Sequence, residues 1–179
     1  MDIQMSVGLV LMYLNRGSYS ALLQRRGMWK DAEKKVLESF PRCLQVTCHG
    51  KLEAGEGSEE ALKRELGEEL GKSFARLYYG HRFHLLAQLA SELKNDKKHV
   101  ITLVSLVPYE FVGAINEVNN VERWLPFAEG ELDLLVPITP DMKKDGAPRD
   151  KLAMFPDEIE AIRKAFEAIK IPEESKIAV

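Results

Sequence analysis

The residues with the clearest chemical potential are three closely spaced glutamates, Glu65, Glu68 and Glu69. Because an α-helix has 3.6 residues per turn, carboxylates at this spacing lie within one arc of a helix surface. Like charges so placed repel by about 0.2–0.5 kcal/mol per pair, and a bound cation would reverse that repulsion. Hard divalent cations such as Mg²⁺ take oxygen ligands, commonly one or two carboxylates with substrate phosphates and water. The spacing indicates a metal site, with a solvated acidic helix face as the alternative.

Two neighbouring features favour the metal site. Arg64 precedes Glu68 by four residues and can pair with it across one helical turn. The loop before the helix contains Gly50, Gly55 and Gly57, which suits a backbone that bends sharply beside a ligand. The loop and the helix together therefore form the most informative stretch of the chain.

A helix predicted over residues 58–70 must present these carboxylates. Ser58 is the expected N-cap, and the two glutamates after it stand where the helix dipole favours negative charge. Leu62, Leu66 and Leu70 recur every four residues, so the helix can pack on a core while an adjacent arc carries the glutamates. The glycine that follows is a natural end for the helix.

Hydrophobic periodicity divides the rest of the chain into strands and helices. We predict a β-hairpin over 7–26, strands at 44–49, 100–107 and 121–124, a mostly helical segment at 74–94, a helical turn at 128–135 and an amphipathic helix at 157–170. The stretch 30–39 is predicted to be a loop or a short helix, and 137–151 a loop. This alternation predicts the α/β class, with helices on the faces of a mixed central sheet.

Composition indicates a soluble globular protein of one domain. The 179 residues are 45% apolar and carry a net charge of −3, so electrostatic binding of the whole protein to DNA or to an anionic membrane is not expected. The apolar run 7–14 is too short to span a bilayer and follows Asp2 rather than a basic cluster, so we expect no signal peptide and a cytoplasmic location. Cys43 and Cys48 are too few for a disulfide scaffold, and no Cys/His set has zinc-finger spacing.

The stretch 50–71 resembles the Nudix box, G-x5-E-x7-R-E-U-x-E-E-x-G-U, in which U is a bulky apolar residue. The matching residues are Gly50, Glu56, Arg64, Glu65, Leu66, Glu68, Glu69 and Gly71. The last apolar position of the box (50–72) holds Lys72, which is a departure from the pattern. The order of the flanking elements is also similar to a Nudix domain, although the segment 74–98 looks longer and more helical than usual. The resemblance implies a single Nudix-like α/β/α sandwich over 1–179, with a frayed C-terminal tail from about 171.

The resemblance implies a hydrolase that cleaves a pyrophosphate bond in a nucleoside diphosphate linked to another moiety. Water attacks phosphorus, while Mg²⁺, or Mn²⁺, neutralises the phosphate oxygens and lowers the pKa of a bound water. By the motif, Glu65 and Glu69 would be metal ligands and Glu68 would share the site, with one of the three as general base. Arg64 would orient Glu65 or Glu68.

The family pattern also implies residues outside the helix. The backbone carbonyl of His49 would contact the metal, and Glu56 would brace the loop and the outer metal shell. A glutamate from the second half of the chain often completes such sites, and Glu117 is our candidate, with Glu122 and Glu129 as competing choices.

Arg25 and Arg26 end a strand that would run towards the site. They are candidates for contact with substrate phosphate, and the alternative is a pair of solvated charges at the end of a strand. Dimers are frequent in the family, so the resemblance also implies a homodimer.

Two competing functions stay open. Isopentenyl diphosphate isomerase resembles Nudix proteins and carries a catalytic cysteine on the strand that leads into the box, so Cys48 invites comparison. Cys48 stands two residues before Gly50 rather than immediately before it, and a one-residue shift on a strand moves a side chain to the opposite face. The other alternative is a non-catalytic nucleotide-binding module. Such modules commonly lose box carboxylates, whereas this chain keeps them.

Overall fold

The longest strand, β1 (Gln4–Asn15), forms the centre of the fold. In the computed structural model, which describes residues 3–31, 33–115 and 121–169, this strand is buried from residue 6 to residue 13. Because alternate side chains of a strand point to opposite faces, a continuous buried run requires cover on both faces. Accordingly, Leu9 belongs to one apolar cluster and Val10 to a second.

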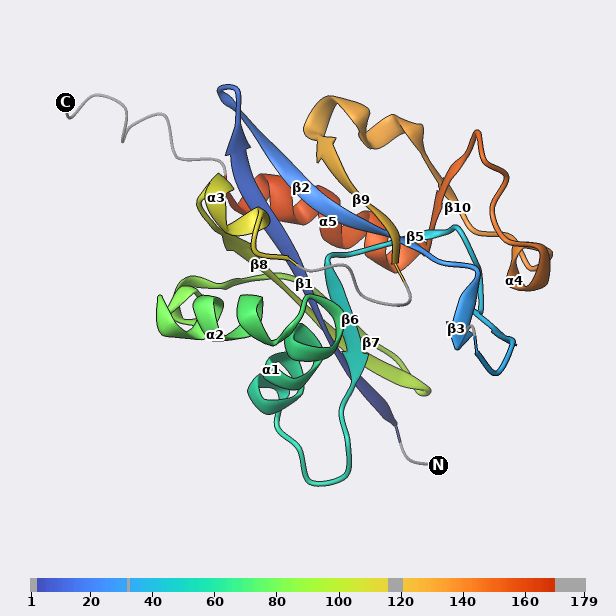
Figure 1. The fold of residues 1–179 in the computed structure, drawn as a ribbon, viewed down its shortest axis with the longest axis horizontal. Coiled ribbons are helices and arrows are strands. Elements are labelled where there is room, and N and C mark those ends of the chain that lie inside the picture. The colour runs from blue at the N-terminus through green and yellow to red at the C-terminus, as the bar shows by residue number, and fades with distance from the viewer. Residues whose placement is uncertain (1–2, 32, 116–120, 170–179) are drawn as a thin grey trace.

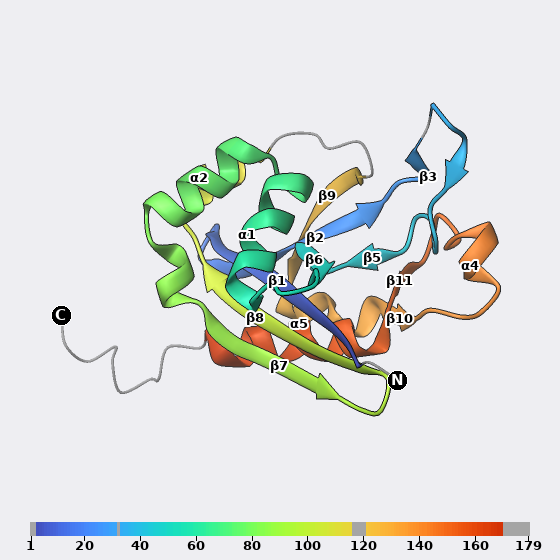
Figure 2. The ribbon, with the colours of Figure 1, turned by 90° about the horizontal axis from the view of Figure 1, so that it is seen from below.

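Helices cover both faces of the sheet, as predicted for the α/β class. Helices α1 (Ser58–Glu69) and α2 (Lys72–Gly80) lie on one face, and α5 (Pro156–Ala168) lies on the other (Figures 1 and 2). The leucine stripe of α1 is buried in the cluster that contains Leu9. The apolar face of α5 packs into the cluster that contains Val10.

Within the described residues, the main sheet has the strand order β10-β11-β5-β2-β1-β8-β7, with β6 also paired to β1 and β9 to β2. β1 is antiparallel to β2 and parallel to β8, so the sheet is mixed. The other strands are β2 (Ser18–Arg26), β3 (Trp29–Asp31), β4 (Val36–Leu37), β5 (Leu44–Gln45), β6 (Cys48–Lys51), β7 (Gln88–Lys94), β8 (Lys98–Leu106), β9 (Val121–Ala128), β10 (Leu135–Pro137) and β11 (Leu152–Met154). The short helices are η1 (Phe83–Leu86), α3 (Tyr109–Val112), η2 (Glu129–Leu134) and α4 (Met142–Asp145).

β1 changes partner along its length, and this change positions the candidate site. Its C-terminal part pairs with β2, and its N-terminal part pairs with β6. β2 and β6 thus diverge from β1 at a fork, and Thr47 bonds to both β1 and β2 there. Its hydroxyl accepts a hydrogen bond from the Leu11 backbone N–H at 2.8 Å and donates to the Leu22 carbonyl. The fork explains why the single strand predicted at 44–49 is divided into β5 and β6.

The segment 74–94 is the largest correction to the sequence prediction. It contains α2, η1 and β7 rather than one helix, and β7 pairs antiparallel with β8. Helix α2 ends at Gly80, and Arg82 then adopts a left-handed backbone with φ of 59°. Leu85 and Leu89, which are four residues apart as on one face of a helix, are both exposed. Pairing with β8 therefore outweighs the local helical pattern.

Several boundaries also differ from the prediction. The stretch 30–39 contributes to the β3–β4 hairpin, and the predicted loop 137–151 contains α4. β9 continues past the predicted end at residue 124, and its Pro126 is tolerated because β9 pairs with β2 alone among the described strands. The hairpin 7–26 is confirmed as β1 and β2.

The N-cap of helix α1 is Gly57, one residue before the predicted N-cap Ser58. The Glu60 carboxylate accepts a hydrogen bond from the Gly57 N–H at 2.9 Å, which satisfies one donor at the helix start. The tail predicted to fray from about 171 lies outside the described residues. In the described ranges, no helix combines the length and the apolar character needed to cross a membrane.

Candidate active site

The face of α1 that meets β6 carries two of the three glutamates. The Glu69 carboxylate accepts a hydrogen bond from the backbone N–H of His49 at 3.1 Å and another from the Cys48 thiol. The Glu65 side chain packs directly against the backbone of Gly50. Because β6 is paired to β1 and α1 is anchored by its leucines, both carboxylates are held between a strand and a helix.

Arg64 ties the glycine-rich loop to this helix. It donates to both carboxylate oxygens of Glu56 at 3.0 and 2.9 Å, to Glu65 at 2.7 Å and to the carbonyl of Lys51 at 2.8 Å. The hydrogen bonds from Arg64 hold the pKa of Glu56 below its usual value, and Glu56 in turn raises the pKa of Arg64. Arg64, Glu56 and Glu65 therefore form one network, in which Arg64 orients the carboxylate of Glu65.

Glu68 lies at the outer edge of this network. Its side chain is 62% exposed, and Arg64 Nη1 bridges it to Glu65, at 3.6 Å from Glu68 and 2.7 Å from Glu65. In the described part of the chain, no three His, Cys, Asp or Glu side chains are gathered as a metal-binding group. The structure thus brings Glu65 and Glu69 together on the inner side and leaves Glu68 facing solvent.

The electrostatics of the two inner carboxylates suit a cation. Burial raises the pKa of Glu69 to about 7, and the charge of Glu65 adds to that rise, while the His49 N–H and the Cys48 thiol oppose it. Burial also raises the pKa of Glu65, against the hydrogen bond from Arg64. An oxygen-binding dication would stabilise both ionised carboxylates and offset their repulsion. These carboxylate donors therefore suit a hard divalent cation.

Sequence reasoning missed a buried carboxyl group, Glu158 of α5. Its Oε2 accepts a hydrogen bond from the Val46 N–H at 3.2 Å, and its Oε1 is 3.7 Å from Nδ1 of His49. Burial raises the pKa of Glu158 to about 8 and lowers the pKa of His49, so both groups favour their neutral forms at pH 7. The sequence contains a signal for the burial of Glu158, since this residue shares a helical face with the apolar residues Ile162 and Ala165.

Both arginines predicted to contact substrate are engaged with protein groups. Arg25 is buried and donates to the carbonyl of Lys151 at 3.2 Å, and burial lowers its pKa. Arg26 donates to Glu38 and to Gln45. These contacts link β2 to β5 and to the segments beside it.

Of the three candidates for a distal glutamate, Glu117 lies outside the described residues. Glu122 on β9 and Glu129 at the start of η2 are both exposed. The hydrogen-bond and ion-pair partners of Arg64 are instead Lys51 at the end of β6, Glu53 and Glu56 of the loop before α1, and Glu65 and Glu68 of α1.

The site residues of β6, of α1 and of the loop between them lie within a region that matches a known protein family. A model of the NUDIX domain matches residues 2–145. No curated protein matches this sequence closely enough to count as a relative. Among solved structures, a MutT/nudix family protein from Listeria innocua is 18% identical, with 99% of each chain covered and a TM-score of 0.60.

Two further structures share this fold. The NUDIX domain of Shewanella oneidensis NrtR, solved with ADP ribose, is 11% identical over 95% of this chain and 90% of that one, with a TM-score of 0.57. An Ap4A hydrolase from C. elegans is 14% identical over 93% of this chain and 96% of that one, with a TM-score of 0.53. The family model spans most of the chain and includes the loop, the helix and the strand that form the site, so this chain belongs to the Nudix family.

Proposed function

We propose that this chain is a metal-dependent hydrolase that cleaves a pyrophosphate bond in a nucleoside diphosphate linked to another moiety. The observation that carries the proposal is the placement of Glu65 and Glu69, which are partly buried between α1 and β6, with Glu65 oriented by Arg64 and Glu69 by the His49 N–H. Family membership supports it. ADP ribose, bound to the NUDIX domain of NrtR, and Ap4A, for which the C. elegans hydrolase is named, are compounds of this chemical class.

In this proposal Glu65 and Glu69 hold Mg²⁺, with Mn²⁺ as the alternative, and the His49 carbonyl and Glu56 complete its surroundings. The bound ion supplies positive charge for the phosphate oxygens and lowers the pKa of a bound water. Arg64 keeps Glu65 in place and holds the loop against the helix. Glu68, which faces solvent, is the carboxylate best placed to accept a proton from an attacking water.

The position of Cys48 favours hydrolysis over an isomerase with a catalytic cysteine. Cys48 is 0% exposed, and burial raises the pKa of its thiol well above the usual value. The thiol donates to Glu69 inside the protein, so it is neither ionised nor in contact with solvent where a substrate would bind. Retention of both inner carboxylates favours an enzyme over a binding module, and the cytoplasm is the compartment we propose for it.

An assay that separates the phosphorylated products by chromatography tests the proposal, because cleavage of an internal pyrophosphate bond leaves one phosphate end on each product. The purified chain is incubated with ADP-ribose, nucleotide sugars and dinucleoside polyphosphates in Mg²⁺, in Mn²⁺ and in EDTA. We expect turnover of at least one compound, dependent on metal and lost in Glu65→Gln. Glu160→Gln, an exposed carboxylate on α5, is the matched control and should keep wild-type turnover. If no compound of the panel is hydrolysed with either metal, the result would favour a non-catalytic nucleotide-binding module.

A further inference from the structure

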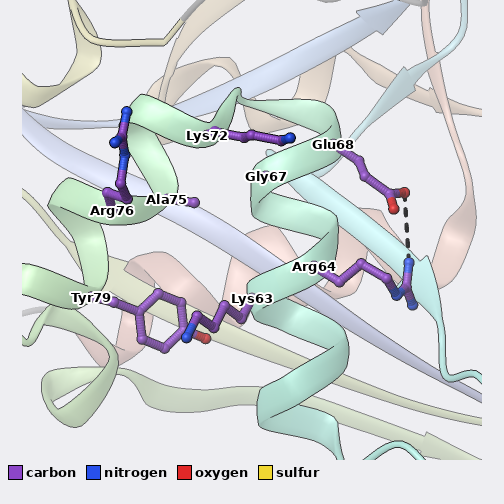
Figure 3. Close-up of a pocket in the computed structure, with 8 residues that line it drawn as sticks. All are labelled: Lys63, Arg64, Gly67, Glu68, Lys72, Ala75, Arg76 and Tyr79. Atoms are coloured by element: carbon purple, nitrogen blue, oxygen red, sulfur yellow. Dashed lines mark ion pairs between the residues drawn. The ribbon is translucent and has the colours of Figure 1, made fainter.

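A groove between α1 and α2 lies beside the box helix, on the face of the molecule away from α5. Its volume is about 680 Å³, which is within the range of pockets that bind small molecules. Figure 3 shows side chains from both helices along it, with Tyr79 and Arg76 from α2 on one side. The lining residues are Lys63, Arg64, Gly67, Glu68, Lys72, Ala75, Arg76 and Tyr79.

The charge of this groove is strongly positive. Lys63, Lys72 and Arg76 are exposed, and none of them forms an ion pair with a carboxylate in the described ranges. The lining includes a single carboxylate, Glu68, which is already 3.6 Å from Arg64. Lys63 lies over the ring of Tyr79, with its Nζ 5.5 Å from the ring centre. The protein itself therefore leaves two of these cations, Lys72 and Arg76, without a counter-charge.

At two positions of the groove, packing within the protein does not explain the residue type. Gly67 stands inside α1, where glycine destabilises a helix relative to alanine, yet a Cβ at this position would meet no atom within 4 Å. Lys72 occupies the box position that normally holds a bulky apolar residue. Both facts have a common explanation if the space beside Gly67 is used by a ligand with negative charge.

We propose that the groove between α1 and α2 binds a second anionic arm of the substrate, a phosphate chain or phosphorylated group beyond the diphosphate that is cleaved. This proposal rests on the proposed function, because the arm must reach the groove from the box. Arg64 and Glu68 belong to both the network around Glu65 and the lining of the groove, so the two regions are continuous.

The chemistry of the lining favours phosphate. Lys72 and Arg76 stand four residues apart, so they lie on one face of α2, and a guanidinium can bind two phosphate oxygens at once. Tyr79, half-buried at the far side, offers a ring against which a base or sugar can pack. The groove is bounded by two helices, and its volume of about 680 Å³ leaves room for a phosphate chain.

Calorimetry with inorganic tripolyphosphate in EDTA tests the groove without metal or turnover. We expect wild-type protein to bind, and Lys72→Ala/Arg76→Ala to bind about tenfold or more weakly, as loss of two charge-assisted contacts implies. Arg163→Ala/Lys164→Ala removes the same charge from α5 and should bind as wild type. Gly67→Leu should weaken binding by filling the groove while it keeps the helix folded. Equal affinity in all four proteins would overturn the proposal.

Steady-state kinetics then connect the groove to the substrate. For a dinucleoside tetraphosphate, Lys72→Ala/Arg76→Ala should raise KM about tenfold with kcat nearly unchanged, because it removes binding distant from the reacting bond. For ADP-ribose, whose diphosphate ends in an uncharged sugar, both constants should stay as in the wild type. Equal effects on the two substrates would overturn the subsite even if hydrolysis is real. Binding of tripolyphosphate that depends on Lys72 and Arg76, in a chain that hydrolyses nothing, would instead overturn the proposed function and keep the anion site.

Discussion

Gly50 and Glu65 are in such close contact that no side chain fits between them. A Cβ built on Gly50 would overlap the carboxylate carbon and one carboxylate oxygen of Glu65. Gly50 has no left-handed backbone, so the reason for glycine here is space rather than conformation. The first and the central positions of the box are thus linked by direct packing of β6 against α1.

Gly50→Ala should therefore displace Glu65 and lower both stability and activity. Overpacking of this kind typically costs about 1–3 kcal/mol, and moving Glu65 should remove most turnover. Gly130→Ala is the matched control, since a Cβ there would meet nothing within 4 Å. Urea unfolding and the chromatographic product assay measure the two effects. Wild-type activity in Gly50→Ala would show that Glu65 does not need its present position.

Replacing Arg64 should loosen the loop before α1. Lysine cannot make the paired contact with Glu56 together with the bonds to Glu65 and Lys51, so Arg64→Lys should destabilise by about 1–2 kcal/mol and reduce kcat. Arg163→Lys on α5 is the control: Arg163 pairs with Glu160 in solvent, and its loss should cost about 0.5 kcal/mol or less. Denaturant midpoints of the two variants, measured side by side, test whether Arg64→Lys loses more stability than Arg163→Lys.

Glu69→Gln separates a metal site from a carboxylate that is merely buried. With Mg²⁺ at a hundredfold excess over Kd, wild-type protein should gain about 2.7 kcal/mol, and the variant should lose much of that gain and most turnover. Without metal, the variant should be as stable as the wild type or slightly more so, because glutamine can still accept from the His49 N–H. Thermal melts of both proteins across a Mg²⁺ titration provide the measurement. Identical responses would remove Glu69 from the metal site.

Glu158 should make stability depend on pH. The folded carboxyl keeps its proton to about pH 8, whereas an unfolded glutamate loses it near pH 4.5, so the folded state binds the extra proton between these values. Stability should therefore fall as pH rises from about 4.5 to 8. Glu158→Gln should remove part of this slope and be the more stable protein at pH 9, by a few kcal/mol at most, since each pKa unit is worth about 1.4 kcal/mol. Glu160→Gln, exposed on the same helix, should keep the wild-type slope.

Cys48→Ala should leave hydrolysis largely intact. The thiol is buried and protonated, and its contribution to the site is one weak hydrogen bond to Glu69. Cys48→Ser restores a donor of similar size and is the companion variant. Circular dichroism first establishes that each variant is folded. A folded Cys48→Ala protein without turnover would favour the isomerase-like alternative.

The local sequence was sufficient for the box and for the elements with strong periodicity. Residue types at fixed spacing predicted the carboxylate-bearing helix, because its leucine stripe and its glutamates follow the 3.6-residue repeat. The continuous apolar run of β1 predicted a buried strand, and the turn residues after it predicted the hairpin with β2. The family followed from the same residues, since the box is a contiguous pattern of side chains.

The tertiary structure alone decided features that depend on partners distant in the chain. Gln88–Lys94 is a strand because β8 is beside it, although its leucines repeat like those of a helix. Glu68 faces solvent and Glu69 faces inward because β6 contacts only one side of α1, and spacing on a helix does not say which side that will be. Glu158 lies 3.7 Å from His49 although more than a hundred residues of chain separate them. Such contacts arise from long-range packing, which local periodicity does not encode.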